Sequence, residues 1–410
     1  MLRLFLPTPL KPMAVINKTM KKLRIGVIGI GNMGYAHAVC IAENGVKGMC
    51  LNAVCDINHE RTEEFKKNYP AVKIYTDYKE LLKSDEVDAV IIAVPHPLHS
   101  EIAIIAFENS LHVMLEKPAD ISVSRVKRLN EVANKYGKIF GIMFNQRTNP
   151  LFIKAREIVK SGLLGELKRT VWIVTNWYRT QSYYDSGDWR ATWAGEGGGV
   201  LLNQAPHNLD LWQWICGMPK SVTAYCDVGK YHNIEVEDDV TIFTRYENGA
   251  TGTFITSTGE YPGTNRLEIS GTKGKIVIEN KTLKWWKLKE NEREVCNNSA
   301  DSFVCIETEY TEIKQELTET AHKGILQNFA NAILYGEELL SPGTDGIFEL
   351  TISNAAYLSS WKENKEISLP FDFDEFDSLL NELISNSKKR IADKNCPAPK
   401  EYIERWQVRW

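Results

Sequence analysis

The 410-residue sequence has no apolar run long enough to cross a bilayer. A spanning helix needs about 20 apolar residues, whereas the longest apolar run, 89–94, has only the length of a strand. Neither sign of charge is in excess, since 49 Lys and Arg stand against 53 Asp and Glu. The composition thus indicates neither a nucleic-acid-binding surface nor an acidic tail. We therefore expect no nucleic acid and no membrane among the partners.

The eight cysteines also lack the spacing of metal ligands and the density of a disulfide framework. Cys55 ends an apolar run that predicts a buried strand, so we expect reduced thiols, a cytoplasmic location and no metal site. The first twenty residues weakly resemble a signal peptide. Pro7, Pro9 and Pro12 interrupt their apolar stretch, however, and no small-residue cleavage site follows. We interpret residues 1–20 as an N-terminal arm.

From Leu23 onward the sequence alternates short β-rich runs with helical patterns. This alternation predicts a doubly wound parallel sheet, and the continuously apolar run 87–94 is typical of a parallel strand covered on both faces. We therefore expect an α/β protein whose residues 21–148 form a nucleotide-binding Rossmann domain. The expected strands span 23–29, 50–56, 87–94, 111–115 and 138–144, and the expected helices span 33–44, 60–68, 98–110 and 122–136.

The first expected strand runs into a glycine-rich turn that reads Gly29-Ile30-Gly31-Asn32-Met33-Gly34. Gly29 permits a tight turn, Gly31 lets a pyrophosphate approach the backbone, and Gly34 allows the helix to pack closely on the strand. Because this G-x-G-x-x-G pattern lies between a strand and a helix, it predicts a dinucleotide site that includes Asn32 and Met33.

Asp56 ends the second expected strand and identifies the dinucleotide. A carboxylate at this place accepts hydrogen bonds from ribose hydroxyls and repels a 2′-phosphate. We therefore expect NAD rather than NADP. The alternative is a structural turn followed by a surface aspartate, and the order of strand, turn, helix and acid argues against it.

Polar side chains also follow two later strands, in the segments Pro95-His96-Pro97-Leu98-His99 and Glu116-Lys117-Pro118. Ligands bind at the carboxyl ends of parallel strands. The cofactor-binding candidates from these segments are therefore Pro95, His96, His99, Glu116 and Lys117. For His99, packing at the start of a helix is the favoured alternative.

Three segments together resemble the Gfo/Idh/MocA oxidoreductases: GIGNMG, AVPHPLHSEIAIIAFENSLHVMLEKP and GGGVLLNQAPHNLD. The resemblance covers about residues 21–370. It implies a Rossmann domain followed by an α/β domain with a large, mostly antiparallel sheet. It also implies NAD(P)-linked oxidation or reduction of a sugar or cyclitol carbon.

The resemblance assigns catalysis to Lys117 and His207. Oxidation of a secondary alcohol needs a base within hydrogen-bond reach of the hydroxyl, and a histidine suits that role near neutral pH. Lys117 would polarise the same oxygen or relay its proton. Asn203 stands where the family often has an acid, so a carboxylate relay there is doubtful, although an amide still binds a sugar hydroxyl. Asp210 would orient the helix or the ligand.

The second half of the sequence predicts a domain at 149–370 for substrate binding and oligomerisation. A strand is expected at 166–177, a helix at 200–216, β-rich runs at 221–288, and helices near 323–335 and 345–361. The open face of the resulting sheet is the expected interface of a homo-oligomer, a dimer, a tetramer or a larger assembly. Residues 371–410 are expected to form a tail outside the core.

Aromatic side chains are concentrated between Trp172 and Trp193, just before the expected catalytic helix. Their faces stack on the C–H faces of pyranose rings, so we expect this loop to line a sugar site, with some of its aromatics in the core instead. Its substrate-binding candidates are Tyr178, Trp189 and Arg190. Arg147 is a candidate for either a substrate contact or a structural one.

The leading hypothesis is an NAD-dependent dehydrogenase that oxidises a secondary hydroxyl of a sugar or glycoside. The segment DWRATWAGEGGGVLLNQAPHNLDLWQW is similar to family members that oxidise hexopyranosides, at carbon 3. One alternative is a glycoside-cleaving enzyme that recycles its NAD, and a second is an inositol dehydrogenase. The third is a non-catalytic NAD-sensing regulator, against which the presence of both Lys117 and His207 argues.

Overall fold

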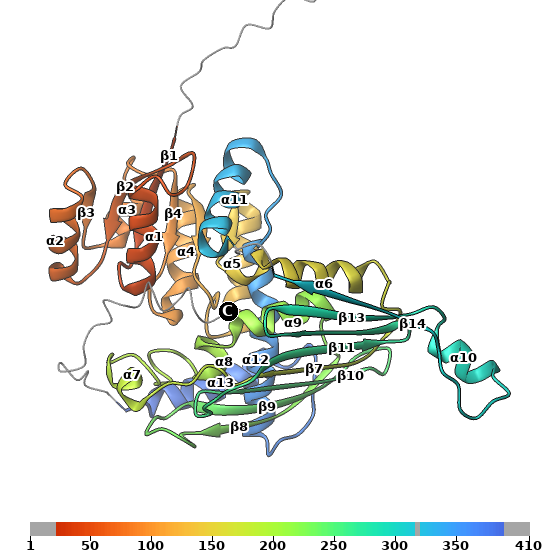
Figure 1. Ribbon diagram of the computed structural model, residues 1–410. Helices are drawn as coiled ribbons and strands as arrows, with labels where there is room; N and C mark the ends of the chain where they lie inside the picture. The colour runs from red at the N-terminus through yellow and green to blue at the C-terminus, as the bar shows by residue number, and fades with distance from the viewer. Residues whose placement is uncertain (1–21, 316–319, 389–410) are drawn as a thin grey trace, which may run out of the picture.

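The computed structural model describes residues 22–315 and 320–388, which build two sheets (Figure 1). The first sheet has six strands in the order β3-β2-β1-β4-β5-β6, all parallel. Its strands are β1 (Leu23–Ile28), β2 (Met49–Cys55), β3 (Lys73–Tyr75), β4 (Ala89–Ile92), β5 (His112–Leu115) and β6 (Phe140–Ile142). The expected Rossmann-type sheet is therefore confirmed, and β3, at three residues too short to give a pattern, is added to it.

Helices connect these strands and bury one side each against the sheet. On α5 the buried residues recur at helical spacing, from Val123 through Val126 and Leu129 to Ala133, and Gly137 ends the helix with a positive φ of 60°. The connecting helices are α1 (Asn32–Ala42), α2 (His59–Asn68), α3 (Tyr78–Lys83), α4 (His99–Glu108) and α5 (Val123–Tyr136), with short 3₁₀ turns η1 (His96–Leu98) and η2 (Asn145–Thr148).

One helix from the far end of the chain returns to the first sheet (Figure 1). In α11 (Ala321–Tyr335), the buried side chains of Ile325, Leu326 and Phe329 share a core with Ile25 and Val27 of β1. The strand partner of Gly141 is Pro342, just after this helix. The nucleotide-binding unit is thus completed by residues far beyond the boundary expected at 148.

The second sheet has nine strands in the order β14-β13-β12-β11-β7-β10-β9-β8-β15. All neighbours are antiparallel except β7 and β10, so the expected mostly antiparallel sheet is confirmed. The strands are β7 (Leu167–Val174), β8 (Ser221–Val228), β9 (Glu237–Arg245), β10 (Thr251–Ser257), β11 (Asn265–Gly271), β12 (Gly274–Glu279), β13 (Thr282–Leu288), β14 (Thr308–Lys314) and β15 (Ile367–Ser368).

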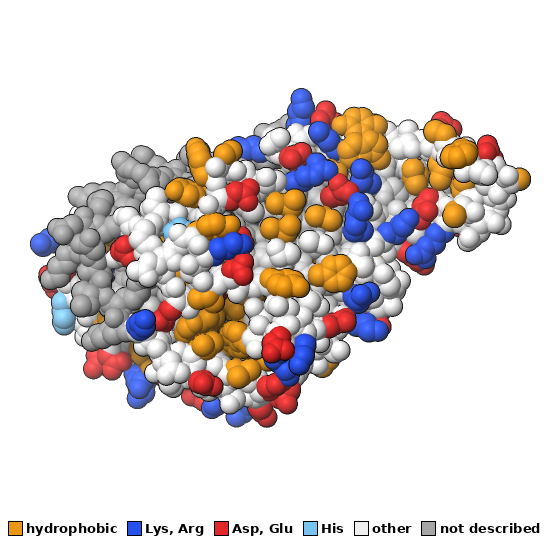
Figure 2. Space-filling model, turned by 90° about the horizontal axis from the view of Figure 1, so that it is seen from below, with side chains coloured by type: hydrophobic (Ala, Val, Ile, Leu, Met, Phe, Trp, Pro, Cys, Tyr) orange, Lys and Arg blue, Asp and Glu red, His pale blue; other side chains and the backbone are white. Residues whose placement is uncertain are grey.

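Within residues 22–315 and 320–388, helices cover one face of this sheet and leave the other open (Figure 1). In β9 the buried residues Ile242 and Thr244 alternate with the exposed residues Thr241, Phe243 and Arg245, as the period of a strand requires. Figure 2 views the molecule from below and shows apolar side chains among charged ones on this side. The helices of this half are α6 (Pro150–Lys160), α7 (Gln181–Asp185), α8 (Val200–Asn203), α9 (Pro206–Cys216), α10 (Glu292–Asn298), α12 (Gly346–Trp361) and α13 (Phe373–Ser385), with the 3₁₀ turn η3 (Gly343–Asp345).

Two expectations for this half need correction. The helix expected at 200–216 is divided into α8 and α9, because Pro206 has no N–H for an i−4 hydrogen bond and begins a new helix instead. The segment after 370 is not wholly outside the core, since α13 buries Phe376, which stacks on Trp361. Residues 1–21 and 389–410, which include the expected arm and most of the expected tail, lie outside the described residues.

Candidate active site

The glycine turn at the end of β1 has the room that a dinucleotide requires. Gly29 has a positive φ of 82°, and a Cβ on Gly34 would lie 1.7 Å from the Gly29 carbonyl oxygen. A Cβ on Gly31 would meet nothing within 4 Å, so this part of the backbone is open. Gly31 is also the N-cap of α1 and provides no side-chain cap for the helix N–H groups. These residues fit a pyrophosphate at the positive end of α1.

Asp56, just after β2, lies against this turn. Its Oδ2 accepts a hydrogen bond from the main-chain N–H of Ile30 (2.8 Å), and its Oδ1 accepts one from that of Asn58 (2.9 Å). Each oxygen retains a free lone pair for a ribose hydroxyl. Arg61 of α2 has its guanidinium 3.8 Å from the carboxylate and is exposed. The arrangement fits the ribose of NAD.

Lys117 and His207 come from different domains and approach one another at the carboxyl end of the parallel sheet. Lys117 follows β5, and its Nζ donates to the main-chain carbonyl of Asn203 at the end of α8 (2.8 Å). His207, in the first turn of α9, is 3% exposed and has its ring edge-on to Phe144. Burial lowers the pKa of His207 well below its usual range, and the charge of Lys117 lowers it further. The imidazole is therefore neutral at neutral pH, the form that accepts a proton.

Burial also lowers the pKa of Lys117, an effect that neighbouring acids oppose. The first of these acids is Glu116, which hydrogen-bonds His37 of α1 (2.7 Å). Although burial opposes ionisation, the hydrogen bond with His37 and the nearby side chains of His322 and Lys117 lower the pKa of Glu116 to about 2. His322 of α11 lies beside His37, with ring centroids 5.7 Å apart. Neither His37 nor His322 was predicted, because both are brought here by helices distant in the sequence.

The two histidines after β4 have different surroundings. His99 is 1% exposed, and its ring nitrogens lie 2.6 and 2.8 Å from the carbonyl oxygens of Pro118 and Val94. Main-chain carbonyls thus contact both ring nitrogens, and His99 connects the segments that follow β4 and β5. Its expected contact with the cofactor is corrected to this structural role. His96 has its Nδ1 3.0 Å from the Glu196 carbonyl oxygen and its ring edge-on to Trp189. Pro95 is exposed at the start of the same turn.

Arg147 and Asp210 form a buried ion pair with each other. Arg147 Nη2 and Nε donate to the two oxygens of Asp210 at 2.6 and 2.8 Å, and the two side chains are 1% and 0% exposed. Arg147 Nη1 donates to Asp345 (2.7 Å). Because the donors of Arg147 and the oxygens of Asp210 are satisfied within the protein, the structural alternative is favoured over a substrate contact for both residues, and the pair fixes α9 against η2.

Asn203 is held by a buried acid that the sequence analysis did not single out. Its amide nitrogen donates to Glu196 Oε1, and the other oxygen of Glu196 accepts from the N–H of Ala191 (2.6 Å). Glu196 is 2% exposed. The sequence feature that indicates Glu196 is its position directly before Gly197-Gly198-Gly199.

The glycine segment before α8 is fixed by a second buried acid, Glu237 of β9. Its oxygens accept from the N–H groups of Gly199 and Leu201 (2.9 Å each), and Tyr357 of α12 donates to it (2.7 Å). Burial raises the pKa of Glu237 to about 7, although these hydrogen bonds oppose the shift. The Glu237 side chain is 1% exposed, so this acid belongs to the interior of the domain.

Most tryptophans of the aromatic segment belong to the core. Trp172 and Trp212 pack on Phe254 of β10, and their indole N–H groups donate to Asn265 and Thr170. Trp177 and Trp193 are 5% exposed. The expectation that this segment lines a cleft therefore needs correction for Trp172, Trp177 and Trp193, and Trp212 of α9 lies in the core as well, because large aromatics fill the space between sheet and helices.

The remaining aromatic candidates stay accessible. Tyr178 is 42% exposed, and Trp189 is partly exposed beside His96. The guanidinium of Arg190 lies over the rings of Trp189 and Tyr183, 4.6 Å from each centroid, and donates to the Tyr183 hydroxyl (2.9 Å). Trp189 and Arg190 thus lie beside His96 and Glu196, whereas Tyr178 lies against Tyr261.

An amide-rich cavity of about 400 Å³ lies beside η2, the turn that packs on α9. Gln146 lines it and is 2% exposed, and neither polar atom of its side chain has a partner among the described residues. Asn176, after β7, also lines it with an unpartnered buried oxygen. Unpartnered buried amides favour a ligand that both donates and accepts hydrogen bonds.

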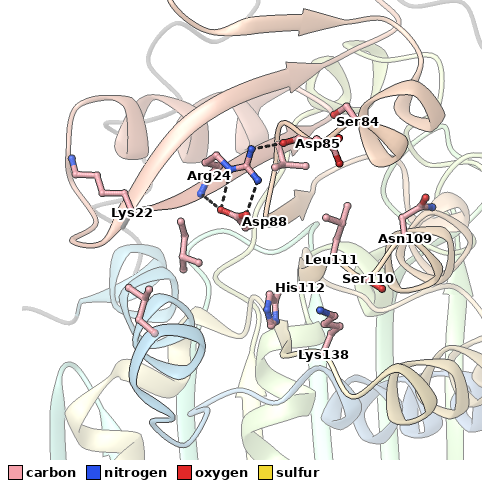
Figure 3. Close-up of a pocket in the computed structure, with 13 residues that line it drawn as sticks. Lys22, Arg24, Ser84, Asp85, Asp88, Asn109, Ser110, Leu111, His112 and Lys138 are labelled. Carbon is pink, nitrogen blue, oxygen red and sulfur yellow. Dashed lines mark hydrogen bonds and ion pairs between the residues drawn. The ribbon is translucent and has the colours of Figure 1, made fainter. Parts of the chain in front are cut away.

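A second pocket, shown in Figure 3, lies at the opposite end of the parallel sheet. Its lining residues precede or begin the strands, such as Arg24 at β1, Asp88 before β4 and Lys138 before β6. Arg24 is bound within it by Asp88 (2.8 Å). Cofactors of such sheets bind at the carboxyl ends, so this pocket is separate from the candidate site.

Among the residues with described placement, no group of three or more His, Cys, Asp or Glu is arranged to hold a metal ion. Within the same part of the chain, no helix combines the length and apolar character of a membrane span.

Two family models match the chain. The model described as oxidoreductase family, NAD-binding Rossmann fold, matches residues 23–144. The model described as GFO/IDH/MocA C-terminal domain matches residues 152–277.

Curated relatives and solved structures agree with these models. Myo-inositol 2-dehydrogenase of Thermotoga maritima is 26% identical over 355 residues, 85% of this chain and 98% of the relative. Levoglucosan dehydrogenase of Pseudarthrobacter phenanthrenivorans is 25% identical over 291 residues, 63% of this chain and 74% of the relative. The crystal structure of the WlbA dehydrogenase from Bordetella pertussis in complex with NADH and UDP-GlcNAcA aligns with a TM-score of 0.71 and 25% identity, covering 86% of this chain and 100% of that chain.

Proposed function

The chain belongs to the Gfo/Idh/MocA family of NAD-binding oxidoreductases, and we propose that it oxidises a secondary hydroxyl of a sugar or glycoside to a ketone. The observation that carries the proposal is the approach of Lys117 and a neutral, buried His207 beside a glycine turn that fits a dinucleotide. The relatives named above act on cyclitols and sugars, which supports a polyhydroxylated substrate.

Within this proposal each side chain of the site has one task. His207, whose imidazole is neutral in the buried site, takes the proton of the substrate hydroxyl. Lys117, held by the Asn203 carbonyl, stabilises the oxygen as negative charge develops on it. The nicotinamide of bound NAD supplies the acceptor for the hydride. Gly31, Asn32, Met33 and Gly34 hold the pyrophosphate, and Asp56 holds the ribose.

The substrate contacts are proposed from the side chains that remain accessible. Trp189 and Tyr178 present aromatic faces for a pyranose ring, and Arg190 and Asn203 present groups for its hydroxyls. The amide-rich cavity offers the Gln146 and Asn176 side chains as further hydrogen-bonding groups for a polyhydroxylated substrate. The substrate is proposed to be a glycoside oxidised at carbon 3, on the resemblance of residues 188–214 to family members that oxidise hexopyranosides.

We further propose a homo-oligomer, a dimer, a tetramer or a larger assembly, formed through the open face of the nine-stranded sheet (Figure 2). Tyr225 and Phe243 are 57% and 38% exposed there, and Ile173 and Ile255 lie on the same face. Such an apolar patch is typical of an interface. A cytoplasmic location is likewise proposed, and the unpaired state of the seven described cysteines supports it.

The test is NADH formation on incubation with NAD and a panel of hexoses, glycosides and inositols. Lys117→Ala and His207→Ala should each lower turnover by a factor of about 10² to 10⁴ and leave NADH affinity, measured by fluorescence titration, within about twofold. Lys127→Ala, a matched change at an exposed lysine of α5, should leave both unchanged. Near-normal turnover in either active-site variant would overturn the assignment.

The same panel separates the alternatives. A glycoside-cleaving enzyme that recycles NAD would release the aglycone without net NADH. An inositol dehydrogenase would reduce NAD with inositols and with no hexose or glycoside. A non-catalytic regulator would bind NADH and reduce NAD with nothing in the panel.

A further inference from the structure

Glu196 connects three separate segments of the site. Its carboxylate accepts from the Ala191 N–H and from the Asn203 amide, and its carbonyl oxygen lies 3.0 Å from Nδ1 of His96. The residue is 2% exposed. Burying a carboxylate is costly unless hydrogen bonds satisfy it, and these contacts provide them.

The contact between Glu196 and Asn203 fixes the direction of an amide. A carboxylate only accepts hydrogen bonds, so it must face the NH₂ group of Asn203. The Asn203 amide oxygen is thereby turned away from Glu196 and presented as an acceptor. At this place the Asn203 amide oxygen can accept a hydrogen bond from the O–H of a substrate hydroxyl.

Asn203 also connects Glu196 with the lysine of the site. The main-chain carbonyl of Asn203 accepts from Lys117 Nζ (2.8 Å), so any displacement of Asn203 displaces the partner of Lys117. Burial raises the pKa of Glu196, and the charges of Arg190 and Lys117 oppose the shift. The other titratable side chain coupled to this carboxylate is Tyr184.

We propose that Glu196 is a positioning residue that replaces an acid at position 203: it orients the Asn203 amide oxygen toward the substrate hydroxyl and fixes the carbonyl that holds Lys117. The inference rests on the proposed function, since it assigns part of the positioning in that reaction to this acid. It is distinct from the roles of Lys117 and His207, because Glu196 acts through Asn203.

The test exchanges the acid and the amide. In Glu196→Gln one acceptor oxygen becomes an NH₂ group, which must face either the Ala191 N–H, donor against donor, or the Asn203 amide, which then has to turn its NH₂ instead of its oxygen toward the substrate. Asn203→Asp places two carboxylates in contact. The double variant E196Q/N203D restores one amide facing one carboxylate, with the carboxylate now on the substrate side. Glu235→Gln is the matched control, because Glu235 accepts from the Trp193 N–H (3.0 Å) in the same loop.

Each variant is measured by kcat and KM with the substrate found in the panel, by a pH–rate profile, by NADH affinity and by melting temperature. We expect Glu196→Gln and Asn203→Asp each to lower kcat/KM about 10- to 100-fold, as loss of a hydrogen bond to a charged group does. Asn203→Asp should also move the acid limb of the profile to higher pH, because two adjacent carboxylates share a proton. The double variant should return to within about fivefold of the wild type, and NADH affinity should not change.

A packing role alone predicts a different pattern. Glu196→Gln, which has the same shape, would then resemble Glu235→Gln, and the losses in the double variant would multiply. Either result overturns the positioning role while the wild type remains active. If the wild type oxidises nothing in the panel, the proposed function falls and the positioning role with it. Melting temperatures lowered in both single variants and restored in the double one would then still identify the pair as a structural contact.

Discussion

Asp56 offers the sharpest test of how the site selects its cofactor. The carboxylate is 8% exposed, and each oxygen already accepts one main-chain N–H, from Ile30 or Asn58. Its remaining lone pairs are the ones available to ribose hydroxyls. Asp56→Ala removes these acceptors together with the negative charge that repels a 2′-phosphate.

The size of the effect follows from the hydrogen bonds that are lost. A hydrogen bond to a charged group contributes about 1.5–3 kcal/mol, which corresponds to a loss of about 10- to 150-fold in kcat/KM for NAD. Use of NADP should rise, because the repulsion is gone and Arg61, 3.8 Å from the carboxylate, becomes available to a phosphate. The ratio of kcat/KM for NAD to that for NADP should therefore fall by more than either value changes alone.

Two further variants show whether charge or turn geometry is responsible. Asp56→Asn keeps one acceptor for the Ile30 N–H and removes the charge together with the second acceptor, which serves the Asn58 N–H, so NADP use should still rise while NAD use falls less. Glu64→Ala removes an exposed charge from the same helix α2 and should change neither cofactor by more than about twofold. An unchanged NAD to NADP ratio in Asp56→Ala, with initial rates measured at saturating substrate, would refute the reasoning.

Three other predictions concern stability and the glycine turn. Asp210→Asn should lower the free energy of unfolding by about 1.5–3 kcal/mol in urea titrations, because one of the two acids paired with the buried guanidinium of Arg147 loses its charge while Asp345 remains. The pKa of Glu237, about 7 when folded against an ordinary 4.5, means that its stabilising effect is complete below pH 4.5 and lost as pH rises through 7. The unfolding free energy of the wild type should therefore fall between pH 5 and 8 by up to about 3 kcal/mol more than that of Glu237→Gln. Gly31→Ala should keep the wild-type melting temperature, since its Cβ meets nothing within 4 Å, yet raise the Kd for NADH at least about tenfold, since that space is the approach to the pyrophosphate.

The cofactor turn was predictable because its constraints are local. The glycines of 29–34 are needed for the geometry of this one turn: Gly29 adopts a positive φ, and Gly34 lies too close to the Gly29 carbonyl for a side chain. Strand and helix periodicities are local as well, which is why the parallel sheet and the larger antiparallel one were both expected. The return of α11 to the first sheet was not expected, because an amphipathic pattern does not indicate which of the two sheets a helix covers.

The aromatic segment shows where composition misleads. A group of tryptophans is equally consistent with a carbohydrate cleft and with a core, because both bury large ring areas. What separates them is the partner of each indole, and those partners lie far away in sequence: Asn265 for Trp172 and Thr170 for Trp212. Only Trp189, whose ring meets His96, remains at the site.

Glu196 shows the opposite case, a side chain that the sequence did not assign to the site and that the folded chain places there. At position 203 the sequence shows an amide where the family often has an acid, which suggested the loss of a function. In the folded chain Glu196 brings a carboxylate to the amide nitrogen of Asn203, seven residues away in sequence. Whether a site lacks a functional group therefore depends on which side chains the folded backbone places within 3 Å of it. Here the turn at Gly197-Gly198-Gly199, which Glu237 holds in place, positions the Glu196 carboxylate beside Asn203.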